Sequence, residues 1–275
     1  MIPSRPQIIL VTGASSGIGK ATVQALLAQG YRVHAGARRV EKMESLKTAG
    51  AVVHSLDVTD EISIKTLVDT IHKDEGRLDV LVNNAGFGVY GSIEDVSVEE
   101  ARHQFEVNLF GLACLTRLAL PPMRERGAGL IINISSMGGK VYTPLGAWYH
   151  ASKHALEGWS DCLRLEIAPF GIRVVIIEPG AIATEFGELA IAPLLERSGE
   201  GPYAGMAQNM AAATRRTFTG GKASPPSLIA DLIVKVITSP RPKTRYVAGY
   251  LSRPVMFARR VLGDRGFDWM IRRFL

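Results

Sequence analysis

The chain has 275 residues, of which 47% are hydrophobic and 21% charged, a length and composition that fit one large globular domain and exclude disordered and fibrous proteins. Of the net charge of +6, residues 251–275 supply +4, since they hold six Arg and two Asp. The remaining chain is only +2 and has no basic stripe, so we expect no nucleic-acid partner for it.

Short β-branched runs alternate along the chain with longer segments that carry apolar residues at helical spacing. The predicted strands, in chain order, are Ile8 to Thr12, Tyr31 to Gly36, Ala51 to Leu56, Leu78 to Asn83, Leu130 to Ser135, Arg173 to Glu178 and Arg245 to Ala248. This alternation is typical of a parallel sheet covered by helices. We therefore predict a Rossmann-like α/β fold, a doubly wound parallel seven-stranded sheet with helices on both faces.

The clearest helix follows the first strand, because apolar side chains recur at helical spacing from Ile18 to Leu26 and Gly30 supplies a stop. Further helices are predicted over Asp60 to Asp74, Val98 to Arg126, Trp148 to Ala168 and Ser227 to Thr238. Residues 181–224 break this rhythm and predict a helical insert that acts as a substrate lid. No linker or internal repeat appears, so residues 1–275 are predicted to form a single oxidoreductase domain with an Arg-rich tail at 251–275.

The apolar runs of the chain and its two cysteines are informative about the cellular compartment. Ile8 to Val11 is too short an apolar run for a secretory signal, and no uncharged run approaches the roughly 20 residues of a membrane span. Cys114 and Cys162 lie in apolar stretches and are predicted to be buried free thiols, not a disulfide or a metal site. We expect a cytoplasmic protein without a bound metal.

A glycine-rich turn from Thr12 to Gly19 joins the first strand to the first helix. Glycines permit a tight turn, and a helix N-terminus offers free N–H groups to a pyrophosphate. At the end of the second strand an NAD-binding domain usually has an acid, but this chain has Arg38 and Arg39. Two guanidinium groups suit a 2′-phosphate, so we predict NADP(H) as the cofactor, with Arg38 as its contact.

Tyr149 and Lys153 are four residues apart on a predicted helix and therefore share a face. A phenol needs its pKa lowered from about 10 to act near neutrality, and a nearby ammonium favours the phenolate. Ser135 and Ser136 end the fifth strand, where ligands of open α/β sheets bind. The spacing to Tyr149 favours Ser136.

These motifs together resemble the short-chain dehydrogenase/reductase family over residues 7 to about 185, with a looser similarity to its retinol and 17β-hydroxysteroid dehydrogenase branch. The matching strings are Thr12 to Gly19, Asn83 to Gly86, Asn108, Ser136, Tyr149 to Lys153 and Pro179 to Gly180. The resemblance implies that Tyr149 is the general acid and base and that Lys153 lowers its pKa and holds the nicotinamide ribose. It also implies that Ser136 orients the substrate oxygen and that Asn108 holds a water linking Lys153 to a proton relay.

The same resemblance implies a cofactor site and, because family members are commonly dimers or tetramers, a homo-oligomer. The predicted cofactor-binding residues are Gly13, Ser15, Ser16, Gly17, Ile18, Gly19, Arg38, Asp57, Val58, Asn84, Ala85, Gly86, Tyr149, Lys153, Pro179, Gly180, Ile182 and Thr184.

We predict an NADP(H)-dependent oxidoreductase that moves a hydride between the nicotinamide and a carbonyl or secondary alcohol. The predicted substrate-binding residues are Ser136, Met137, Leu145 and Tyr149. With Met206 and Met210 they favour a bulky apolar substrate, although such residues also serve as ordinary core. Two alternatives stay open, a non-catalytic NADPH-sensing or scaffold protein and a binder of nucleic acid or a membrane surface through the tail, the latter contact being weak.

Overall fold

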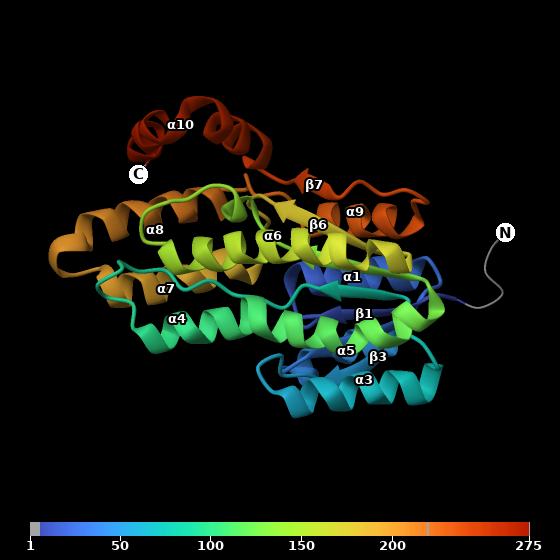
Figure 1. Ribbon diagram of the computed structural model, residues 1–275. Coiled ribbons are helices and arrows are strands. Elements are labelled where there is room, and N and C mark those ends of the chain that lie inside the picture. The colour runs from blue at the N-terminus through green and yellow to red at the C-terminus, as the bar shows by residue number, and fades with distance from the viewer. Residues whose placement is uncertain (1–5, 219, 275) are drawn as a thin grey trace.

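The computed structural model describes residues 6–218 and 220–274, in which one twisted parallel sheet is covered by helices on both faces (Figure 1). The described strands are β1 (Ile8–Thr12), β2 (Arg32–Ala37), β3 (Val52–Ser55), β4 (Val80–Asn83), β5 (Gly129–Ile134), β6 (Ile172–Pro179) and β7 (Arg245–Ala248). They pair in the order β3-β2-β1-β4-β5-β6-β7, all in parallel. The predicted Rossmann-like fold is confirmed.

Strand β1 is apolar along its whole length because both of its faces are covered. Ile9 and Val11 point into one hydrophobic cluster, whereas Ile8 and Leu10 point into the other, as the two-residue period of a strand requires. The strand order reverses on the two sides of β1, so the crevice beyond the carboxyl ends of β1 and β4 is where a ligand of such a sheet binds.

One face of the sheet carries α1 (Gly17–Ala28), α2 (Glu44–Thr48) and α9 (Ser227–Thr238), and the other carries α3 (Glu61–Glu75), α5 (Gly111–Arg126) and α6 (Ala147–Ile167). The short α2, with the 3₁₀ turn before it, was not predicted, since five helical residues give too little periodicity to recognise.

The predicted helix from Val98 to Arg126 is interrupted. It consists of α4 (Val98–Phe105), a π-helical turn (Glu106–Phe110) and α5. A π turn adds one residue to the helix and is common at functional sites, and this one carries Asn108.

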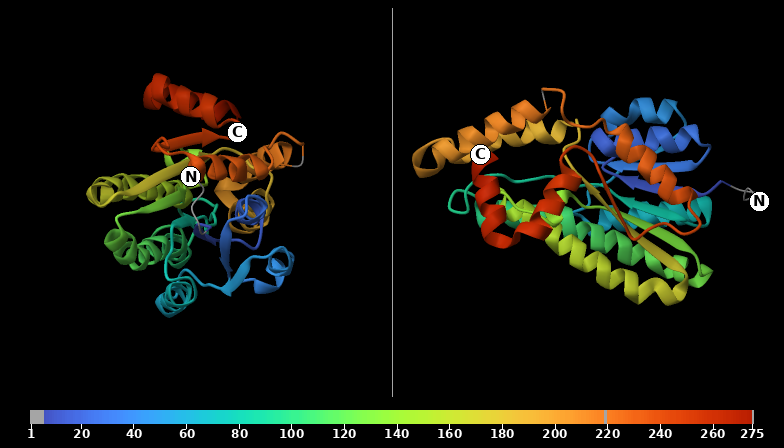
Figure 2. Two further views of the ribbon diagram at one scale, coloured as in Figure 1. Left: turned by 90° about the vertical axis from the view of Figure 1, so that its right-hand side faces the viewer. Right: turned by 90° about the horizontal axis from the view of Figure 1, so that it is seen from above.

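The predicted insert holds two helices, α7 (Glu185–Ser198) and α8 (Ala204–Phe218), which extend together beyond the carboxyl edge of the sheet (Figures 1 and 2). The tail forms α10 (Ser252–Phe274), bent at Gly263, whose φ of 61° a glycine adopts without strain. No helix in the described ranges combines the length and the apolar character needed to cross a membrane.

Both cysteines are free, but the expectation that they are buried is wrong. Cys162 is exposed and Cys114 is half-buried, with its sulfur 3.5 Å from the Glu61 carboxylate. Each lies on the outer part of a helix whose other face packs on the sheet, and the apolar stretches of the sequence did not separate the two faces.

Candidate active site

The glycine-rich turn after β1 is shaped by close backbone approach. A Cβ on Gly19 would lie 2.3 Å from the Gly13 carbonyl oxygen, and Gly13 and Gly17 adopt positive φ angles of 66° and 52°. Helix α1 starts with Gly17, has no acid in its first turn, and its N-cap Ser16 makes no capping hydrogen bond through its side chain. A pyrophosphate fits such a turn, because the first backbone N–H groups of a helix have no partner within the helix and favour an anion.

Asn84 and Ala85 brace this turn from β4. The Asn84 side chain donates to the carbonyl oxygens of Thr12 at 2.9 Å and Gly13 at 3.3 Å. The Thr12 hydroxyl in turn accepts from the backbone N–H groups of Asn84 and Ala85, both at 3.0 Å. Asn84 and Ala85 thus fix the shape of the glycine-rich turn from Thr12 to Gly19, called the phosphate turn below. The sequence did not indicate this role.

Arg39, and not Arg38, contacts the phosphate turn. Its Nη2 donates to the hydroxyls of Ser15 at 3.4 Å and Ser16 at 3.2 Å and lies 3.3 Å from the Glu185 carboxylate. Arg38 is exposed, and its charge is directed toward Asp57. Burial raises the pKa of Asp57, but the Thr59 hydrogen bonds and the Arg38 charge outweigh it and lower that pKa. Sequence reasoning noted both arginines and assigned only the first.

Tyr149, predicted as the acid and base, is 7% exposed near the N-terminus of α6. Burial raises its pKa, and hydrogen bonding with Ser136 opposes that rise. The surroundings therefore favour the protonated phenol. The adjacent Ser135 hydroxyl is buried and has no partner among the described residues, so Ser136 is the serine that meets Tyr149.

Lys153 is fully packed one turn beyond Tyr149, and its Nζ donates to the Ile134 carbonyl oxygen at 3.0 Å. Burial lowers its pKa to about 8, while the Glu157 carboxylate acts in the opposite direction. The Lys153 ammonium is bound to the carbonyl oxygen at the end of β5, and burial is the main influence on the Tyr149 pKa. The expected lowering of that pKa by Lys153 stays a prediction.

The π turn points Asn108 into the same region. Its side chain accepts from the Phe87 N–H at 3.0 Å and donates to the Phe87 carbonyl oxygen at 2.9 Å and to the Ser152 hydroxyl at 3.0 Å. A Cβ on Gly86 would lie 3.1 Å from Asn108 and 3.7 Å from Lys153, so both side chains line the backbone there. Its predicted role in holding a water stays a prediction.

Aromatic rings from two segments, one of them the start of the predicted insert, pack against Tyr149. The rings of Tyr90 and Phe186 lie 5.6 Å and 5.5 Å from the Tyr149 ring, and Phe186 is the second residue of α7. Leu145 packs with Leu194 of α7 in a small apolar cluster above the site. Leu145 has a φ of 60°, which is uncommon for a leucine and marks a constrained backbone next to the site.

The methionines of the insert differ in position. Met210 packs against the cluster that contains Leu145, but Met206 is 40% exposed and faces away from it. The two methionines one helical turn apart therefore do not both line the site. Met137 is half-buried beside Ser136.

The remaining predicted residues lie around the same crevice. Thr184 is the residue before α7, makes no capping hydrogen bond through its side chain, and packs against Gly17, 3.0 Å from where a Cβ would be. Ile182 is 5% exposed, and Gly180 donates to the Ala248 carbonyl oxygen at 2.8 Å just beyond Pro179, the last residue of β6. Three further predicted residues, partly or fully buried, are Ile18, Val58 and Asp57.

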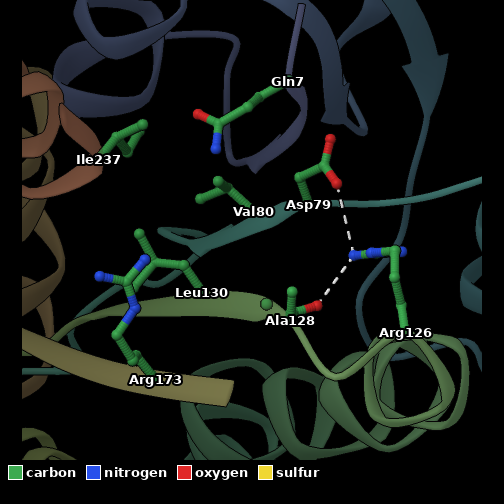
Figure 3. A pocket seen from close by; sticks show the side chains of 9 residues that line it. Gln7, Asp79, Val80, Arg126, Ala128, Leu130, Arg173 and Ile237 are labelled. Atoms are coloured by element: carbon green, nitrogen blue, oxygen red, sulfur yellow. Dashed lines mark hydrogen bonds and ion pairs between the residues drawn. The ribbon is translucent and has the colours of Figure 1, made fainter. Parts of the chain in front are cut away.

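A second hollow lies at the opposite, amino edge of the sheet, lined by residues that include Asp79, Arg126 and Arg173 (Figure 3). Arg126 donates to the Ala128 carbonyl oxygen at 3.0 Å and lies 3.4 Å from Asp79. Arg173 donates to the carbonyl oxygens of Ser239 and Pro240. The hollow shares no lining residue with the crevice beside Tyr149.

Comparison with known proteins agrees with this geometry. A family model described as short chain dehydrogenase matches residues 7–192. A 3-ketodihydrosphingosine reductase from Bacteroides thetaiotaomicron is 44% identical over 182 residues, which is 66% of either chain. An NADPH-dependent 3-dehydrocapnine reductase from Ornithobacterium rhinotracheale is 40% identical over 203 residues, 70% of either chain. The structure of a short-chain dehydrogenase from Streptomyces avermitilis matches with a TM-score of 0.81 and 37% identity, covering 94% of this chain and 93% of that one.

Proposed function

The chain belongs to the short-chain dehydrogenase family, and on that premise we propose that it is an NADP(H)-dependent reductase of hydrophobic carbonyl compounds. The observation that carries the proposal is the meeting of Tyr149 with Ser136 at the carboxyl edge of the sheet, while Lys153 and Asn108 line the neighbouring backbone. A protein that only sensed NADPH would need the phosphate turn, but it would not need these four side chains beside one another.

The cofactor part of the proposal rests on Arg38 and Arg39 at the end of β2. Arg39 lies against the serines of the phosphate turn, and no carboxylate ends this strand to hold a ribose 2′-hydroxyl. A guanidinium beside the turn suits a 2′-phosphate. The relative from Ornithobacterium rhinotracheale, which is named as NADPH-dependent, supports the same choice.

The proton part rests on the phenol of Tyr149. The nicotinamide, when bound, supplies the hydride that reduces the carbonyl carbon. Burial raises the pKa of Tyr149, which favours the protonated phenol, and we propose that its hydroxyl protonates the oxygen that becomes an alkoxide. In this proposal Ser136 orients that oxygen and Lys153 contacts the nicotinamide ribose. The hydrogen bond from Lys153 Nζ to the Ile134 carbonyl oxygen supports this by holding the side chain at the end of β5. Reduction is therefore the direction that we propose.

The substrate part rests on the apolar walls. Tyr90 and Phe186 flank the Tyr149 ring, and the cluster of Leu145, Leu194 and Met210 continues the apolar surface under the lid. These groups offer no charge to a substrate, so we propose a ketone on an apolar body. The relative from Bacteroides thetaiotaomicron is named for a keto compound with a long aliphatic chain, which fits such a surface.

We also propose a cytoplasmic location and a homo-oligomer. Two free cysteines, one of them exposed, fit a reducing compartment. The oligomer rests on the family alone.

NADPH oxidation over a panel of ketones tests the function. The panel contains a long-chain amino ketone, a steroid-sized ketone, a cyclohexanone-sized ketone and a small ketone that bears a carboxylate. We expect kcat/KM to rise with apolar size, by up to about fourfold per buried methylene. A preference for the smallest or the charged ketone would contradict the substrate class. Tight NADPH binding without turnover of any ketone would favour the sensor.

A further inference from the structure

Helix α10 stands apart from the layers that build the site. It follows β7 and lies above the sheet, on the end of the molecule from which α7 and α8 project (Figures 1 and 2). The family model ends at residue 192, so the matched part does not include this helix.

The inner side of α10 is anchored. Phe267 is fully buried against the Tyr142 ring, whose hydroxyl donates to Asp268 at 2.9 Å. Arg259 lies over the Tyr142 ring and pairs with Asp264 at 2.7 Å. These contacts hold the helix on the loop after β5, so its outer side chains are not needed to keep it there.

Each half of α10, before and after the non-helical Gly263, repeats one arrangement on an exposed side. An arginine is followed by an exposed large hydrophobic residue four positions later and by a second arginine seven positions later, which places all three on one helix face. The two sets are Arg253, Phe257 and Arg260, and Arg265, Trp269 and Arg272. Phe257 is 68% exposed and Trp269 is 60% exposed.

These outer arginines have no acidic partner among the described residues, and Arg273, on the same side as Trp269, lies over its ring at 4.5 Å. Val261, four residues after Phe257 and 61% exposed, extends the apolar part of this face. A helix face that mixes unpaired arginines with exposed aromatic and aliphatic residues complements the headgroup region of an anionic bilayer. Arginines bind the phosphates there and the aromatic rings reach the acyl boundary.

We propose that the outer face of α10 docks this protein on an anionic lipid surface, with the outer arginines at the phosphates and Phe257 and Trp269 inserted below them. This inference does not depend on the proposed function. A second copy of the chain fits the face less well, because a two-fold contact would bring unpaired arginines together. Nucleic acid would contact the arginines but leave Val261 in water.

Vesicle flotation tests the proposal with the whole chain. Vesicles of phosphatidylcholine alone are compared with vesicles that contain about 30% phosphatidylglycerol. We expect binding to the anionic vesicles only, and weaker binding in about 0.5 M NaCl. The substitutions Arg253→Gln and Arg260→Gln together should weaken the partition coefficient about thirtyfold, since each charge at an anionic surface contributes about fivefold. Phe257→Ser with Trp269→Ser, which keeps every charge, should weaken it by about tenfold or more.

The matched control is Lys65→Gln with Arg117→Gln, which removes the same charge from α3 and α5 on the opposite side of the molecule (Figure 1). It should bind vesicles within about twofold of the native protein. Unchanged thermal unfolding of all variants separates lost binding from lost folding. Equal binding to neutral vesicles, an equal loss in the control, or no binding overturns the proposal. So does a native protein that binds duplex DNA or self-associates through α10 but leaves vesicles unbound.

Discussion

Substitution of Arg39 is the most direct test of the proposed NADP(H) preference, because its guanidinium lies between the phosphate turn and the start of α7. Its Nη2 is 3.2 Å from the Ser16 hydroxyl and 3.3 Å from Glu185. A charge-assisted hydrogen bond to a phosphate contributes about 1.5 to 3 kcal/mol. Arg39→Ala should therefore raise the Kd for NADPH about ten- to hundredfold and leave the Kd for NADH within about twofold. The ion pair with Glu185 is exposed, so its loss should cost at most about 1 kcal/mol of stability.

Titrations of cofactor fluorescence with NADPH and NADH measure both constants. Arg38→Ala tests the assignment made from sequence, and we expect it to act in the same direction through its position beside Asp57. Glu185→Gln should strengthen NADPH binding a fewfold, because its carboxylate would repel the 2′-phosphate at Arg39. Arg102→Ala, an exposed arginine paired with Glu99 on α4, is the matched control.

If Arg39→Ala raised the Kd for NADPH and the Kd for NADH equally, a contact of Arg39 with the 2′-phosphate would be refuted. Arg39 would then act only by fixing the shape of the phosphate turn. No change for either cofactor in the single and double arginine variants would refute the NADP(H) preference itself.

Three further predictions concern the proton donor and two buried titrating groups. Tyr149→Phe should lower kcat by at least about a hundredfold with unchanged NADPH affinity, and a tenth of native turnover would exclude Tyr149 as the acid. Burial and the Glu157 charge raise the pKa of Glu178 to about 7. The stability that its protonated form provides is complete below pH 4.5 and is lost as the pH rises through about 7. Denaturant titrations should therefore show Glu178→Gln more stable than the native protein above that pH. Burial, reinforced by His34, lowers the pKa of His54 to about 4. The native protein should lose stability as the pH falls from 6.5 through 4, and His54→Gln should flatten that loss, whereas an unchanged slope would show that His54 is not its source.

The sequence predicted what local patterns determine. Strands buried on both faces appear as short β-branched runs, and the predicted bounds of β1 and β7 match the structure. The order of the strands was not predicted, because right-handed connections limit the possible orders of an α/β sheet without selecting one. The glycine-rich turn was also recognisable, because its backbone approaches leave no room for a side chain at Gly19.

The sequence did not predict contacts that depend on how the chain turns after a strand or helix ends. Strand β2 ends at Ala37, and the φ and ψ of Arg39, −88° and 73°, turn its side chain to the phosphate turn. Two consecutive arginines look alike in the sequence. In the same way, the i to i+4 spacing placed Tyr149 and Lys153 on one face, but the carbonyl oxygen of Ile134 that holds Lys153 belongs to another element.

The start of α7 contacts both the phosphate turn region and Tyr149. No sequence motif indicated this connection. Glu185 pairs with Arg39 beside the phosphate turn, and the next residue, Phe186, packs on Tyr149. Consecutive residues of a helix lie about 100° apart, so one helical turn reaches two neighbouring sites at once. If a 2′-phosphate binds Arg39, as we propose, it would compete with Glu185 and so remove a contact at the start of α7, next to Phe186. On that proposal, we expect cofactor binding at Arg39 to be linked to the packing of Phe186 on Tyr149 through one turn of helix.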